Sequence, residues 1–279
     1  MSNARRRKES TGQIYTLGHK LGEHNTIIEQ SASPSRRVLP QGFAVGTRLN
    51  GYGGGAYTID RCGSFIFAES RNGGVYELDP ATSQVDNLVA GLPGRQYADF
   101  DANPCSPQWV VAVCSQGPRQ IGQCIVLINR KTKEVHTLIH GSDFYLHPRF
   151  SPCGTRLLWM QWTLPYMPWN GAVLYTAELN GTLLVKHKRI AGEPGKFGVS
   201  QPRWGPDGSF YFVYDVTGYW QLYHVAPKAQ EYSKIRLQGL ETVDFAAAEF
   251  YVRRFELSLF EQDLFLHLGV IALAFTTLR

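Results

Sequence analysis

The strongest constraint on the fold of this chain is an internal repeat. Residues 147–155 read HPRFSPCGT, and residues 201–209 read QPRWGPDGS, with proline, arginine, an aromatic residue, proline and glycine at matching positions. Each copy is followed by an apolar run, RLLWMQW or SFYFVYD. Proline pre-sets the backbone of a tight turn, and glycine tolerates the left-handed conformation at its end. Each copy therefore predicts a strand, a turn and a second strand.

Related units extend the repeat toward the N-terminus. Weaker strand-turn-strand copies occupy 56–70 (AYTIDRCGSFIFAES) and 97–115 (YADFDANPCSPQWVVAVCS). A third predicted strand follows each of the four pairs, and a more polar fourth strand follows each third strand. The third strands centre near Tyr76, Val126, Leu174 and Leu222, in steps of 50, 48 and 48 residues; the fourth strands lie near 85–89, 135–139, 184–190 and 234–237. Four strands in each such period are typical of a β-propeller blade.

The pattern predicts an all-β chain, a β-propeller of four-stranded antiparallel blades that is incomplete, with four to five recognisable blades. We expect the propeller to cover 11–245, with a partial first blade at 11–50 that lacks its inner strand and four blades at about 51–238. We expect residues 1–10 to form a disordered basic tail. Blades taken from a larger ring leave open edges with unpaired backbone groups, so self-association through these edges is one expectation.

The C-terminal segment 246–279 departs from the repeat. Its apolar run at 264–278, LFLHLGVIALAFTTL, is shorter than the ~20 residues that a membrane-spanning helix needs. We interpret the segment as a divergent blade or as the tail of a truncated chain, and a membrane anchor is the less favoured alternative.

Charge and cysteine content limit the classes of partner. The net charge is +5, and part of it lies in the cluster Arg5-Arg-Arg-Lys8, so no nucleic-acid partner is predicted. No apolar signal segment follows this cluster. The five cysteines form no C-x-x-C pair and no zinc spacing. We therefore expect a cytoplasmic protein with reduced cysteines and with neither a metal nor a cofactor.

Two patterns suggest ligand sites, and their context argues against both. His136 and His140 have the spacing of a helical metal site, but they fall on a predicted strand, where the rise separates them by about 13 Å. Residues 50–57, NGYGGGAY, fit the loose dinucleotide pattern G-x-G-x-x-A. That pattern needs a strand before it and a helix after it, whereas two predicted strands follow here. We interpret the glycines as backbone in a crowded loop that leads into a blade.

Several segments in the same order resemble a known family. They are GYGGGAY (51–57), YADF (97–100), DFYLHPRFSPCGTRLLWMQW (143–162), PYMPWNGAVLYTAEL (165–179) and QPRWGPDGSFYFVYDVTGYWQLYHV (201–225). Together they resemble the N-terminal propeller of the prolyl oligopeptidase family of serine peptidases, in the branch similar to dipeptidyl aminopeptidases and acylaminoacyl-peptidases. The resemblance implies a propeller that caps an α/β-hydrolase domain carrying a Ser-Asp-His triad.

The departures from that family bear on activity. The nucleophile motif G-x-S-x-G does not occur in the sequence, and only 39 of the 279 residues follow residue 240. Gly51, Cys153 and Asn170 replace the family's Glu, Asp and Asp. No catalytic residue is carried over. We expect the substrate-gating part of a hydrolase that acts on short peptides or small amides and esters, without a triad of its own. The alternative is a non-catalytic propeller that binds a protein or small ligand, or a degenerate pseudo-enzyme.

The order of strands also predicts a candidate docking or ligand face. In an antiparallel blade, the loop leading into the blade lies at the same end as the loop between its second and third strands. Aromatic and polar residues of such loops should gather at one end: Tyr52, Tyr166, Trp169, Asn170 and Tyr219, with Arg149 at a strand base. One interpretation is that a hydrolase domain, a peptide or a small molecule binds there. The other is that the aromatic rings pack between blades.

Overall fold

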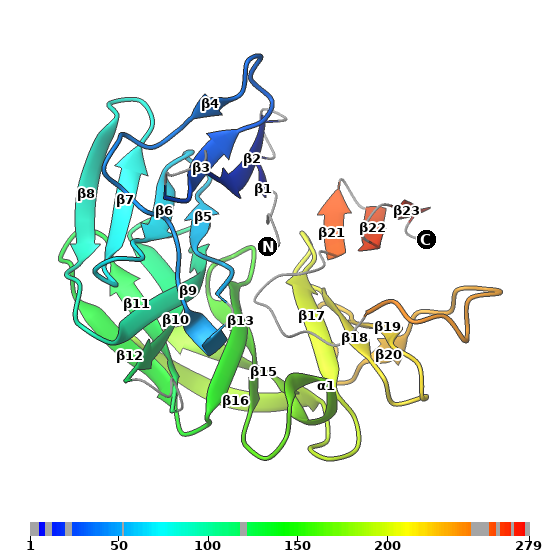
Figure 1. Cartoon of the computed structure of the whole chain (residues 1–279). Helices are drawn as coiled ribbons and strands as arrows, with labels where there is room; N and C mark the ends of the chain where they lie inside the picture. The colour runs from blue at the N-terminus through cyan, green and yellow to red at the C-terminus, as the bar shows by residue number, and fades with distance from the viewer. Residues whose placement is uncertain are drawn as a thin grey trace. The chain divides into compact units, whose positions relative to one another are not determined.

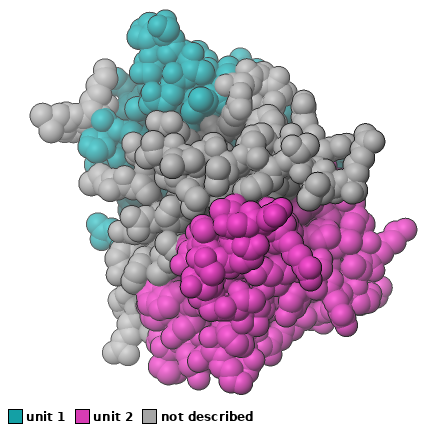
Figure 2. Space-filling view, turned by 90° about the vertical axis from the view of Figure 1, so that its right-hand side faces the viewer, with its two compact units in different colours: residues 1–141 teal, residues 142–279 magenta. Residues whose placement is uncertain are grey.

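The structure is a computed structural model, and it describes residues 6–8, 13–19, 24–51, 53–117, 122–246, 257–260, 263–268 and 271–276. Within these residues the chain is built from β-strands (Figure 1), and its helical elements are the single turn α1 (Pro168–Gly171) and the 3-10 turn η1 (Leu49–Gly51). No helix in the described part is long and apolar enough to cross a membrane. The chain divides into two compact units, residues 1–141 and 142–279 (Figure 2).

The first unit contains three four-stranded sheets, each with its strands paired in sequence order. One sheet is β1 (Arg6–Lys8), β2 (Gln13–Gly18), β3 (Thr26–Glu29) and β4 (Arg36–Arg37). The next is β5 (Tyr57–Ile59), β6 (Phe65–Ala68), β7 (Val75–Asp79) and β8 (Gln84–Val89). The third is β9 (Arg95–Ala102), β10 (Trp109–Gln116), β11 (Cys124–Asn129) and β12 (Val135–His140).

The second unit contains two four-stranded sheets and one three-stranded sheet. The first comprises β13 (Phe144–Phe150), β14 (Arg156–Trp162), β15 (Val173–Asn180) and β16 (Leu183–Ala191). The second comprises β17 (Val199–Trp204), β18 (Phe210–Tyr214), β19 (Gln221–Val225) and β20 (Ser233–Lys234). The third comprises β21 (Leu257–Phe260), β22 (Asp263–Leu268) and β23 (Ile271–Thr276), which fall in the apolar C-terminal segment.

This architecture confirms the predicted fold class. Every described sheet is an antiparallel meander of consecutive strands, and the four repeats of the sequence correspond to the four sheets from β5 to β20. The sheet before them has a strand, β1, that the repeat did not predict. Strand β1 lies within residues 1–10, assigned from sequence to a tail, and it pairs with β2 over Arg6–Lys8.

The repeated turns have the predicted chemistry. Gly154 and Gly208 both adopt positive φ, at 72° and 84°, in the turns that join β13 to β14 and β17 to β18. In the second turn, the Asp207 carboxylate accepts hydrogen bonds from the backbone N–H and the hydroxyl of Ser209. In the first, the Ser151 hydroxyl accepts the N–H of Arg156. Side-chain acceptors thus close each turn, as Asp and Ser commonly do.

The core lies on the middle strands of each sheet. Six consecutive residues of β10, from Val110 to Ser115, are buried, whereas the fourth strand of the same sheet, β12, has no buried residue. Strands covered on both faces read as continuous apolar runs, and a half-solvated strand reads as polar. One core cluster combines side chains of the sheets β5–β8 and β9–β12, including Ile66, Phe100 and Val110.

A buried ion-pair network also joins these two sheets. Arg130, which follows β11, has a side chain only 12% exposed and binds the carboxylates of Asp60 and Glu77. Its Nη1 also donates to the carbonyl of Pro107 at 2.7 Å. Asp60 and Glu77 belong to the sheet β5–β8, so one guanidinium satisfies acceptors from two neighbouring sheets. Burial would lower the pKa of Arg130, but the contacts with Glu77 and Asp60 outweigh it and raise the pKa.

We expect Arg130→Met to lower the free energy of unfolding by about 3 kcal/mol, because it leaves two largely buried carboxylates without their cation. Urea denaturation at neutral pH measures this loss. Arg61→Met is the matched control, since Arg61 is exposed in the turn between β5 and β6, and we expect a change within about 0.5 kcal/mol. If the two substitutions lowered the free energy of unfolding equally, the stabilising role of the Arg130 ion pairs would be contradicted.

Candidate functional site

Three loops meet at one end of the sheets in the second unit. They are 163–172 between β14 and β15, 192–198 between β16 and β17, and 215–220 between β18 and β19. The N–H of Gly195 donates to the carbonyl of Asn170 at 2.8 Å, and the N–H of Gly198 donates to Asp215 Oδ1 at 2.8 Å. The loop leading into the sheet β17–β20 therefore lies beside both loops that join second and third strands, as the alternation of loops predicts.

The loop 163–172 is fixed by its own hydrogen bonds. Asn170 Oδ1 accepts the N–H of Met167 at 2.8 Å, and Pro168 opens the helical turn α1, where its missing N–H is not needed. A Cβ added at Gly171 would lie 2.3 Å from Cβ of Tyr166. Glycine at this position therefore lets the Tyr166 ring lie against the backbone of α1.

Close backbone approach also fixes the loop 192–198. A Cβ at Gly198 would lie 2.3 Å from the carbonyl oxygen of Trp169 and 3.0 Å from the Trp220 ring. A Cβ at Gly195 would lie 3.0 Å from the Tyr166 ring. Glycine is required at Gly198 because backbone of one loop passes directly over another. The result is a surface whose shape is set by backbone contacts among three loops.

The structure brings together four of the five candidate site residues. Tyr166 and Tyr219 are 36% and 39% exposed, Asn170 is exposed, and Trp169 is half-buried. Tyr52 lies outside the described residues. Arg149 does not join the loops, because it pairs with Leu158 beside the turn at the opposite end of β13 and β14. There its Nη1 donates to the carbonyl of Pro148.

Two further apolar side chains extend this surface. Leu164 and Met167 are 47% and 37% exposed, and both belong to the same loop as Tyr166. We call Leu164, Tyr166, Met167 and Tyr219 the loop patch. The alternation of loops in the sequence predicted the tyrosines at this surface, but it did not indicate Leu164 and Met167. Their place in the segment LPYMPWNG was the signal available, since apolar residues beside the two prolines of a loop have no strand face to occupy.

A carboxylate that the sequence did not single out also lies at these loops. Asp215 directly follows β18, and its Oδ1 accepts the N–H of Gly198. Burial, together with the nearby charge of Asp244, raises the pKa of Asp215. The first unit has a similar arrangement, in which Glu69 after β6 accepts the N–H of Ala44 in the loop that leads into the sheet β5–β8. An acidic residue directly after a second strand therefore holds the leading loop in both units.

The glycine-rich segment NGYGGGAY forms another leading loop, in the first unit. Gly51, Gly53, Gly54 and Gly55 all have positive φ, and a Cβ at Gly53 would lie 2.4 Å from the carbonyl oxygen of Thr47. Strands β5 and β6 follow the loop, and no helix N-terminus is present to receive a pyrophosphate. Gly53 therefore serves close backbone approach and all four glycines supply positive φ, as predicted, and the dinucleotide interpretation fails.

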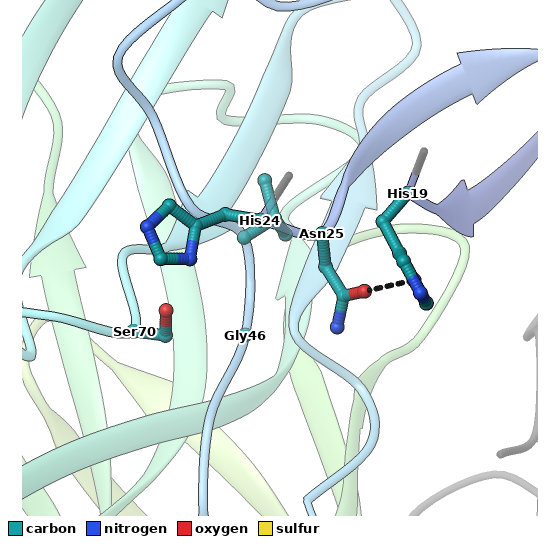
Figure 3. Close-up of a pocket in the computed structure, with 6 residues that line it drawn as sticks. His19, His24, Asn25, Gly46 and Ser70 are labelled. Atoms are coloured by element: carbon teal, nitrogen blue, oxygen red, sulfur yellow. Dashed lines mark hydrogen bonds between the residues drawn. The ribbon is translucent and has the colours of Figure 1, made fainter. Parts of the chain in front are cut away.

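A polar cavity of about 310 Å³ lies elsewhere in the first unit, lined by His19, His24, Asn25, Val45, Gly46 and Ser70. His19 Nδ1 lies 3.0 Å from Asn25 Oδ1, and the His24 ring lies near Ser70 in Figure 3. Among the described residues, no group of three or more His, Cys, Asp or Glu side chains could hold a metal ion. His136 and His140 lie on β12, as the sequence predicted.

Comparisons with known proteins agree with the fold. No family model matches the chain, and no curated protein matches it. The structure of a puromycin-hydrolyzing peptidase from Mycobacterium tuberculosis matches with a TM-score of 0.78 and 23% identity, over 92% of this chain and 42% of that chain. A puromycin hydrolase matches with a TM-score of 0.76 and 22% identity, over 91% and 42%. A prolyl endopeptidase matches with a TM-score of 0.62 and 14% identity, over 95% and 39%.

These matches define the fold and its extent. The chain shares its fold with part of each of these peptidases, in agreement with the β-propeller fold that the resemblance in sequence implied. It spans about 42% of the length of the puromycin-hydrolysing enzymes that it matches.

We expect Asp215→Asn to remove the part of the pH dependence of the free energy of unfolding that comes from titration of the Asp215 carboxyl. The folded state holds the Asp215 proton more tightly than the unfolded chain, because the pKa is raised. Its protonation therefore stabilises the fold at low pH, and this contribution is lost as pH rises from the ordinary value of 3.8 through the folded-state pKa. The asparagine keeps the acceptor for Gly198. Urea denaturation between about pH 2 and pH 7 measures the slope.

Asp207→Asn is the contrasting control. Burial would raise the pKa of Asp207, but hydrogen bonds from Ser209 outweigh it and lower the pKa. Its stabilising effect is therefore present above 3.8 and lost as pH falls through the folded-state pKa. This substitution should reduce stability at neutral pH, in contrast to Asp215→Asn. If both variants shifted the pH dependence in the same direction, the assignment for Asp215 would be wrong.

Proposed function

We propose that this chain is the propeller part of a serine hydrolase of the prolyl oligopeptidase type, acting on short peptides or on small amides and esters. The observation that carries the proposal is the extent of the structural match: 92% of this chain superimposes on 42% of a puromycin-hydrolyzing peptidase. Five sequence segments in family order support the same assignment. In that family the propeller caps an α/β-hydrolase domain.

The proposed role of the propeller is to restrict which molecules reach the catalytic domain. The nucleophilic serine, its histidine and its aspartate belong to the α/β-hydrolase domain, in a longer polypeptide or in a separate chain. The propeller contributes a rigid wall, because glycine-dependent backbone contacts fix its loops. A rigid wall excludes folded proteins by size and admits short, extended substrates.

The loop patch is the proposed docking face for the hydrolase domain. Leu164, Tyr166, Met167 and Tyr219 are each 36–47% exposed and come from two loops held together by the loop 192–198. Solvent-exposed apolar side chains gathered over neighbouring loops are typical of interaction surfaces. Tyrosine in particular combines a large apolar contact area with a polar hydroxyl. Trp169, which is half-buried, belongs to the same loop as Tyr166, and its carbonyl oxygen lies against Gly198.

An active-site probe tests the enzyme assignment. We expect an antibody against this propeller to recover, from the cells that produce it, a polypeptide whose serine reacts with a fluorophosphonate. The recombinant 279-residue chain should not react, because its sequence contains no G-x-S-x-G motif. Gel fluorescence and mass spectrometry of the labelled peptide identify the serine.

Two results would contradict the enzyme assignment. Stoichiometric labelling of the recombinant chain would mean that it carries its own nucleophile. Recovery of the propeller without any probe-reactive serine hydrolase would favour the non-catalytic binding protein instead.

Substitutions in the loop patch test the docking face. We expect Tyr166→Ala and Tyr219→Ala to reduce the probe-labelled hydrolase retained by the immobilised chain about tenfold each, since central tyrosines in interfaces commonly contribute more than 1 kcal/mol. Circular dichroism should remain unchanged. Leu183→Ala is the matched control, because Leu183 is 66% exposed but begins β16, away from the three loops.

The same experiment separates docking from packing. If both tyrosine variants keep their fold and retain the hydrolase fully, the docking proposal is wrong. Trp169→Ala tests the packing interpretation. If this variant alone fails to fold, the Trp169 ring stabilises the loops by packing.

A further inference from the structure

Two cysteines face each other across neighbouring strands of the first unit. In the antiparallel pair β10 and β11, Cys114 lies directly opposite Cys124, and on the other side Cys114 lies opposite Tyr97 of β9. Cys114 is buried, with 7% exposure, and Cys124 is half-buried. The three side chains therefore form a row across the sheet, with Cys124 at the more accessible end.

The backbone places the two thiols within reach of a covalent bond. Residues directly opposite in an antiparallel pair have Cα atoms about 4.5 or 5.5 Å apart, depending on the type of pair. Cα atoms joined by a disulfide are usually about 4.4–6.8 Å apart. Both spacings fall in that window, so a bond between Cys114 and Cys124 requires rotation of side chains and little movement of the strands.

The surroundings give the two thiols different reactivities. The hydrogen-bonding interaction between the Cys114 and Cys124 side chains lowers the pKa of Cys124 against the opposing effect of burial. The guanidinium of Arg95 lowers it further. The hydrogen bond to Cys124, together with burial, raises the pKa of Cys114. Arg95 is held in place by a hydrogen bond from Nη2 to Gln116 Oε1 at 2.9 Å. Cys124 is therefore the more nucleophilic and the more accessible sulfur.

We propose that Cys114 and Cys124 are a redox-active pair that closes to a cross-strand disulfide by exchange with a small disulfide such as oxidised glutathione. The Cys124 thiolate attacks one sulfur of the oxidant, breaks its S–S bond and releases one thiolate. The Cys114 thiol then loses its proton and attacks Cys124 in the mixed disulfide, which releases the second thiol. Two cysteine thiols are oxidised, and one small disulfide is reduced to two thiols.

The pair lies next to the leading loop of the neighbouring sheet. Gln123, directly before Cys124, is buried and donates from Nε2 to Asn50 Oδ1 at 2.6 Å. Asn50 begins the segment NGYGGGAY. A disulfide would therefore fix the end of the β10–β11 hairpin beside this loop. It would also restrict the unfolded chain, so the oxidised protein should unfold at a higher temperature than the reduced protein.

The test is oxidation of the intact reduced protein with oxidised glutathione, followed by thiol titration and peptide mapping. We expect a species lacking two hydrogen atoms, with no bound glutathione, in which Cys114 and Cys124 are linked and Cys62, Cys105 and Cys153 are not linked to either. Cys124→Ser should instead abolish the internal link. Cys153→Ser is the matched control and should leave it intact, although hydrogen bonds with Ser151 and Thr155 lower the pKa of Cys153 to about 7.

A second measurement avoids variants that fail to fold. Phenylarsine oxide, which binds two neighbouring thiols at once, should bind the reduced wild-type protein one to one and block both Cys114 and Cys124. Glutathione adducts on single cysteines without an internal link, a link that involves another cysteine, or arsenical binding unaffected by prior oxidation would each overturn the proposal.

Discussion

The structure depends on the burial of sheets that are apolar on both faces. A middle strand such as β10 is buried over six consecutive residues, so its sheet cannot expose either face to water. In the first unit, the sheets β5–β8 and β9–β12 meet this requirement by sharing one core cluster. Arg130 then neutralises the two carboxylates, Asp60 and Glu77, that this packing brings beside it.

Loops at the sheet ends follow from the same packing. When sheets pack closely, the backbone that leads from one to the next has little room, and glycine occupies the points of contact, as at Gly53 and Gly198. Carboxylates at the ends of second strands, Glu69 and Asp215, then bind the N–H groups of the leading loops. Backbone contacts, and not its own exposed side chains, determine the shape of the loop patch. A shape determined in this way suits both a docking surface and a wall around a catalytic domain.

The paired cysteines add a separate chemical property to the same scaffold. Their proximity results from the register of β10 and β11, and the burial of Cys114 makes it the resolving sulfur rather than the attacking one. The bond would form inside a sheet that is already paired, so oxidation changes the stability of the hairpin without requiring a new fold.

The sequence by itself determined the all-β class, the four repeated strand groups and the conformations of the turn glycines. These features depend on local periods and on backbone sterics, which neighbouring residues specify. It also placed Tyr166, Asn170 and Tyr219 in loops that the structure brings together at one end of the second unit, because the alternation of loops follows from strand order alone.

Only the tertiary structure decided the strand β1, the loop contacts of Asp215 and the pairing of Cys114 with Cys124. Strand β1 is short and basic, so its pairing depends on β2 rather than on an apolar pattern of its own. The contact of Asp215 joins two loops that are distant in sequence, and no local motif indicates which loop passes over its carboxylate. The cysteines are separated by a hairpin whose loop length sets the register, and a shift of one residue would have placed the two sulfurs on opposite faces of the sheet.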